Sequence, residues 1–183
     1  MPIKVTFELS DADLAYFRDV MQNARDKMQG RGEGAVLGAA RRLAREMQKQ
    51  SLPDFVTSRI LQLDALTRML EDEEWRLEGA HRARVVQALA YFAEPCDLIP
   101  DQIPGLGFLD DAIMVELVVQ ELRPELDAYE EFCRFRDAQR AEHGVDPEAQ
   151  QKKLEAQRRA MYTRIERRRE QRERRGGGFS VFR

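Results

Sequence analysis

The sequence predicts an all-α protein, a helical bundle centred on two helices and the proline-rich turn between them, with an extended basic helix near the C-terminus. Charged residues make up 34% of the 183 residues, a fraction that favours long, solvent-facing helices. Apolar residues recur at helical spacing through most of the chain. Three of the seven prolines stand between residues 95 and 104, where they interrupt any helix.

The N-terminal part predicts an extended segment and then a helix. Apolar and polar side chains alternate over residues 3–9, the period of a strand or an extended segment. Ser10 and Asp13 have the spacing of a capping box, with Asp in place of the usual Glu. A first helix is therefore expected over residues 11–28, and it ends at the glycine-rich link 30–34.

Two helices are predicted before the middle of the chain. The apolar stripe from Val36 to Met47 indicates the second helix. Ser51 and Pro53 occupy the order of an N-cap and a first-turn proline, and they predict the start of a third helix. An apolar stripe then continues at helical spacing as far as Leu70.

The central hairpin is predicted from helices over residues 79–93 and 110–122. Asp110 is expected to act as the N-cap of the second of these helices. Pro124 should bend or break the chain, because proline inside a helix removes a hydrogen bond and clashes with the preceding turn.

The last helix is predicted to start at Pro147, and nothing interrupts it before the glycines at 176–178. Its apolar face is thin, with little more than Leu154, Met161 and Ile165. We therefore expect this helix to project from the body, and its removal to leave the fold intact.

Charge suggests the same division of the chain. Residues 151–183 carry 12 Lys and Arg against 4 Asp and Glu, whereas the residues before them carry 18 against 29. The predicted parts are an acidic helical domain over residues 1–145, a basic helix over 146–175 and a flexible end over 176–183. Such asymmetry is informative about partners and self-association.

The turn itself carries a specific motif. Residues 91–111 fit the pattern Tyr-Phe-x-x-Pro-x-Asp-Leu-Ile-Pro-Asp-x-Ile-Pro-x-Leu-Gly-x-Leu-Asp-Asp. This pattern resembles the motif of the YkvA-like family, a domain of unknown function, and the resemblance covers about residues 82–122. It implies a fold element and supplies no catalytic assignment. We assign a structural role to the motif residues Pro95, Pro100, Pro104, Gly107 and Asp110.

Four aspartates of the turn are the candidate metal ligands, since Mg²⁺ and Ca²⁺ prefer several carboxylate oxygens. Two close carboxylates could also separate their pKa values for acid and base catalysis. The favoured interpretation is simpler, because aspartates in turns accept backbone N–H groups. No cofactor other than a divalent cation is considered for this set. The four residues are Asp97, Asp101, Asp110 and Asp111.

Arginines of the last helix are the second candidate set. They could contact nucleic acid or the ribosome, where binding releases counterions, or they could contact anionic lipid or a protein partner. Alternatively, they could be solvated or docked on the acidic body. The residues named for this role are Arg158, Arg164, Arg168, Arg172 and Arg175.

The preferred functional hypothesis is a non-enzymatic interaction module, because each candidate set has a structural explanation. Its partner is an unknown protein or a second copy. A peripheral membrane role follows if Ile99, Ile103, Leu106 and Phe108 stay exposed at the turn. No stretch approaches the length of a transmembrane helix, and the first residues lack the features of a secretory signal. A cytoplasmic location, free or peripheral to the membrane, is expected.

Overall fold

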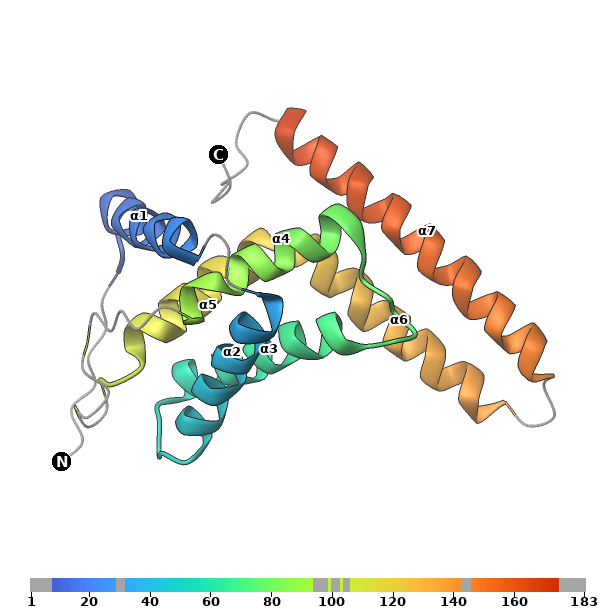
Figure 1. The fold of residues 1–183 in the computed structure, drawn as a ribbon, viewed down its shortest axis with the longest axis horizontal. Coiled ribbons are helices and arrows are strands. Elements are labelled where there is room, and N and C mark those ends of the chain that lie inside the picture. The colour runs from blue at the N-terminus through green and yellow to red at the C-terminus, as the bar shows by residue number, and fades with distance from the viewer. Residues whose placement is uncertain are drawn as a thin grey trace.

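The computed structural model describes residues 8–28, 32–93, 99, 103, 106–142 and 146–174. Within these residues the chain forms seven α-helices and one short 3-10 helix, η1, and no strand (Figure 1). The all-α prediction is confirmed. Most of the predicted extended segment, residues 30 and 31 of the glycine-rich link and the predicted flexible end lie outside the described residues, while the last two residues of that link already belong to a helix.

Helix α1, Asp11–Met28, begins at the predicted capping box. The N–H and Oγ of Ser10 donate to the Asp13 carboxylate at 2.8 and 2.7 Å. The Asp13 N–H donates in return to Ser10 Oγ at 3.3 Å. Ser10 and Asp13 therefore satisfy each other's hydrogen-bonding groups and fix the start of the helix.

Helices α2, Glu33–Gln48, and α3, Asp54–Glu71, pack against each other through their apolar stripes. The N-cap of α3 is Pro53, so the prediction of Ser51 as the N-cap is wrong. Pro53 has an extended ψ of 150°, and its carbonyl accepts the first helical hydrogen bond from Thr57 N–H at 3.0 Å. Because the helix starts after the proline, Ser51 lies outside its first turn.

The hairpin consists of α4, Gly79–Leu89, which continues into η1, Ala90–Ala93, and of α5, Leu109–Glu121. In Figure 1, α4 and α5 run in opposite directions, as the hairpin prediction requires. The two limbs pack on different neighbours: α4 and η1 lie closest to α2, whereas α5 lies closest to α3. The hairpin is thereby built into the core of the bundle.

Helix α6, Arg123–Ala141, follows α5 after a break at Leu122. The predicted break near Pro124 is confirmed, and Pro124 itself stands in the first turn of α6. Leu122 donates to Val118 O and accepts from Leu126 N–H, both at 2.9 Å, so one residue ends α5 and begins α6.

Helix α7, Pro147–Arg174, lies along α6, and the two form the right-hand side of the molecule in Figure 1. Asp146 caps it by accepting the Ala149 N–H at 3.1 Å. Leu154, Met161 and Ile165 are 6%, 1% and 0% exposed. The prediction that this helix projects from the body is wrong, because these side chains complete the apolar core.

Candidate functional site at the hairpin apex

The described part of the apex is Ile99, Ile103 and residues 106–108, between η1 and α5. Backbone hydrogen bonds close it: the N–H groups of Leu106 and Gly107 donate to Ile103 O at 3.2 and 2.8 Å. Phe108 has a left-handed φ of 64°, which costs a non-glycine residue about 1–2 kcal/mol. Burial of its ring, which is 1% exposed, contributes about 1.5–3 kcal/mol and offsets that cost.

Asp110 ties the apex to α5. It is the second residue of the helix, and Phe108 is the N-cap, so the prediction of Asp110 as N-cap is wrong. The left-handed turn at Phe108 starts the helix before the aspartate is reached. The buried Asp110 carboxylate instead accepts the Ile99 N–H at 3.1 Å. It therefore holds a loop residue against the helix.

The apolar side chains of the apex divide between interior and solvent. Phe108 points into the core, whereas Ile103 and Leu106 are 39% and 52% exposed. The sequence left open whether these side chains would be buried, and in the structure Phe108 is buried whereas Ile103 and Leu106 are exposed. The buried Phe108 and Asp110 therefore hold the apex in place, while the side chains of Ile103 and Leu106 are exposed to solvent.

The remaining predicted residues of the turn can be placed only in part. Gly107 and Asp111 are buried. Asp97, Asp101, Pro95, Pro100 and Pro104 lie outside the described residues. Among the residues that the structure does describe, no group of three or more His, Cys, Asp or Glu side chains is placed to hold a metal ion.

Comparison with known proteins bears on this same segment. Residues 81–117 match the model of a family described as Protein of unknown function (DUF1232). A Bacillus subtilis (strain 168) protein named uncharacterized membrane protein YkvA is 38% identical over 71 residues, which cover 36% of this chain and 65% of that relative. We call residues 81–117, the part of the chain that the family model matches, the YkvA-like segment. No solved structure matches the chain. In the part of the chain that the structure describes, no helix is long and apolar enough to cross a membrane.

The YkvA-like segment is clamped from outside by α7. Glu125 of α6 has a fully buried side chain and accepts from Arg84 of the segment at 3.1 Å. Arg169 of α7 donates its Nε–H to the same Glu125 oxygen at 2.6 Å. One buried carboxylate therefore joins α4, α6 and α7. The sequence reasoning missed Glu125, which looks like any other acidic residue of a charged helix.

The predicted arginines of α7 that the structure describes are also engaged with the body. Arg158 donates to Glu74 O at 3.2 Å, and Arg172 donates to Gln120 O at 3.3 Å. The carboxylate partners of Arg164 and Arg168 are Glu131 at 2.8 Å and Asp127 at 3.3 Å. Arg175 lies outside the described residues. Of the alternatives for this helix, these contacts favour docking on the body.

Aromatic rings fill the space between the YkvA-like segment and α7. Trp75, 0% exposed, packs against Tyr162 with ring centroids 4.9 Å apart. Tyr162 donates to Trp75 O at 2.7 Å, and its ring stacks on His81 of the segment at 5.2 Å. Burial lowers the pKa of His81 and raises the pKa of Tyr162. Burial therefore favours the neutral form of each side chain, as packing in an apolar layer requires.

Proposed function

We propose that the protein is a non-enzymatic helical module that attaches peripherally to a membrane through its hairpin apex. The observation that carries this proposal is the exposure of Ile103 and Leu106 on a turn fixed by Phe108 and Asp110. A turn that is already held in place loses little conformational freedom on binding. Exposed apolar side chains on such a turn can enter the apolar boundary of a bilayer directly.

The name of the Bacillus subtilis relative supports a membrane in preference to a protein partner, since that relative is called a membrane protein. The match that connects the two chains includes 65% of the relative's length. The YkvA-like segment is the part of this chain that the family model matches, and the apex lies inside it.

Charge determines which membrane surface this apex should prefer. Residues 94–111 contain five Asp and Glu and no Lys, Arg or His. Anionic lipids would repel such a segment, whereas zwitterionic lipids would not. Attachment should therefore depend on apolar insertion. It should resist added salt, because salt screens charges and leaves apolar burial in place.

The test is sedimentation of the full chain with phosphatidylcholine vesicles. We expect binding that Leu106→Asp weakens by about tenfold or more, since insertion of an apolar side chain is replaced by burial of a charge. Ile103→Asp should act in the same direction. Leu61→Asp is the matched control, because Leu61 is 63% exposed on α3 and lies outside the apex.

Two results would contradict the proposal. One is a wild-type chain that stays in solution with these vesicles while retaining its helical circular dichroism. The other is equal loss of binding in Leu61→Asp and Leu106→Asp, which would show that the apex has no special part. Addition of phosphatidylglycerol should weaken binding, and stronger binding would place the contact on a basic surface instead.

Two alternatives concern other sites of the chain, namely nucleic-acid binding by α7 and metal binding at the turn. The arginines considered for nucleic acid contact the body wherever they are described. For a metal site, the candidates Asp97 and Asp101 lie outside the described residues, while Asp110 is engaged with the Ile99 N–H.

A further inference from the structure

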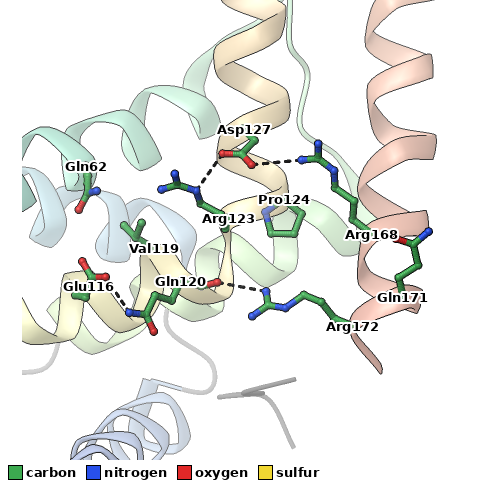
Figure 2. Close-up of a pocket in the computed structure, with 10 residues that line it drawn as sticks. All are labelled: Gln62, Glu116, Val119, Gln120, Arg123, Pro124, Asp127, Arg168, Gln171 and Arg172. Carbon is green, nitrogen blue, oxygen red and sulfur yellow. Dashed lines mark hydrogen bonds and ion pairs between the residues drawn. The ribbon is translucent and has the colours of Figure 1, made fainter. Parts of the chain in front are cut away.

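A cavity of about 580 Å³ opens where the end of α5, the start of α6 and the last turns of α7 meet α3 (Figure 2). Its lining includes Arg123 of α6 and Arg168 and Arg172 of α7. Figure 2 shows the two α7 arginines reaching toward α5 and α6 from one side, while Arg123 lies on the other side of Pro124 in this view and is joined to Arg168 through Asp127. The volume is in the range of small-molecule sites.

Positive charge dominates the lining of this cavity. Its two carboxylates are Glu116 and Asp127. Glu116 is paired with Arg59, which does not line the cavity, at 2.6 Å. Asp127 forms ion pairs with both Arg123, at 3.1 Å, and Arg168, at 3.3 Å. Three guanidinium groups thus line a cavity with a single carboxylate that is not neutralised from outside, and that carboxylate pairs with two of them.

The arginines of the cavity also have more hydrogen-bond donors than the lining has acceptors for them. Arg172 donates to Gln120 O at 3.3 Å, and Asp127 accepts from the other two arginines, as the dashed lines in Figure 2 show. A guanidinium group carries five N–H donors. Three such groups offer far more donors than one carboxylate and one carbonyl can accept. The cavity therefore has unused donors that an additional multivalent acceptor could satisfy.

We propose that this cavity binds a small solute or headgroup that carries a phosphate group. Phosphate is dianionic near neutral pH and matches the planar fork of arginine, which binds it through two parallel hydrogen bonds. Gln62 and Gln171, which also line the cavity, can bond to hydroxyl groups on the rest of the ligand. This inference rests on the cavity alone and is independent of the role proposed for the apex.

Calorimetric titration of the full chain with inorganic phosphate and with glycerol 3-phosphate tests the proposal. We expect saturable binding that Arg172→Gln and Arg123→Gln each weaken by about ten- to a hundredfold, the loss expected for hydrogen bonds to a charged group. Arg123 contacts Asp127 of its own helix, so its replacement leaves the α7 contacts in place. Arg159→Gln is the control, because it removes the same charge from an exposed position of α7 outside the cavity.

Vesicles that contain phosphatidic acid distinguish the two sources of the phosphate group. Binding of glycerol 3-phosphate without vesicle binding assigns a soluble ligand. Vesicle binding that Arg123→Gln abolishes assigns a lipid headgroup. The proposal is overturned if neither probe binds at millimolar concentration, or if Arg159→Gln weakens binding as much as Arg123→Gln does.

Discussion

Replacing Ile165 by alanine tests whether α7 is part of the folded body. Ile165 is 0% exposed and belongs to the same core as Trp75 and Phe132. In a docked helix, the substitution removes buried methyl groups and leaves a cavity. In a projecting helix, the same substitution would be neutral or slightly stabilising, because alanine has the higher helix propensity.

The expected loss is large enough to measure easily. Buried Ile→Ala substitutions cost about 2–5 kcal/mol of unfolding free energy. In a chain of this size each kcal/mol lowers the melting midpoint by about 2–4 °C, so we expect a decrease of roughly 4–20 °C. Thr163→Ala is the control, since Thr163 is exposed and bonds only within its own helix, to Arg159 O at 3.1 Å. It should stay within about 0.5 kcal/mol of the wild type.

Urea unfolding followed by circular dichroism gives both free energies. Tryptophan fluorescence adds a local report, because Trp75 is the single tryptophan and packs against Tyr162 of α7. The reasoning is refuted if Ile165→Ala and Thr163→Ala unfold at the same urea concentration. A shared midpoint would mean that α7 contributes no buried surface in solution.

Two further predictions concern buried charge. Glu125→Gln should lower the free energy of unfolding by about 3–5 kcal/mol, because it leaves Arg84 and Arg169 without their shared counter-ion. Urea unfolding measures this loss, and the control Glu130→Gln, at an exposed position, should show no comparable change. Equal effects of the two substitutions would contradict the prediction. Asp72 should contribute to acid sensitivity: burial acts to raise its pKa, but hydrogen bonds from Trp75 N–H, Arg136 and Tyr129 together lower it. A lowered pKa means that the stabilisation is present above the unfolded value of about 3.9 and is lost as pH falls through the folded pKa. Asp72→Asn should therefore be less stable at neutral pH and lose less stability below about pH 4 than the wild type; parallel melting curves across that range would refute the assignment.

Local signals in the sequence predicted the helices well. The capping box at Ser10 and Asp13, the break before Pro124 and the cap at Asp146 all depend on residues within a few positions of one another. Such contacts depend on spacing alone. Two caps were misjudged, at Ser51 and Asp110, because a neighbouring residue takes the N-cap position. The left-handed conformation of Phe108 has no local signal, since it is stabilised by burial of the ring.

Contacts between distant helices were the part that the sequence did not predict. Tyr162 meets Trp75 across 87 positions, and Arg169 meets Glu125 across 44. One signal was available: Leu154, Met161 and Ile165 follow the seven- and four-residue spacing of a narrow helix-packing seam. The abundance of arginine around this seam concealed it. Long arginine stems can cover apolar surface while their charged groups reach acidic partners.

The docking of α7 explains the uneven distribution of charge along the chain. The acidic residues that give the body its negative charge include Glu125, Asp127 and Glu131 of α6, and these are partners of α7 arginines. Basic tail and acidic body are therefore complementary halves of one intramolecular interface. Removal of α7 would uncover Trp75 and leave Glu125 with only Arg84 of its two described partners, so the shortened chain should be strongly destabilised, contrary to the expectation from sequence. Arginines at the cavity are the exception to this balance, because there three guanidinium groups share Asp127 and one carbonyl. Two arginines of the tail, Arg168 and Arg172, therefore keep unused donors at the junction where α7 meets α5 and the start of α6, which is where an anion would add acceptors.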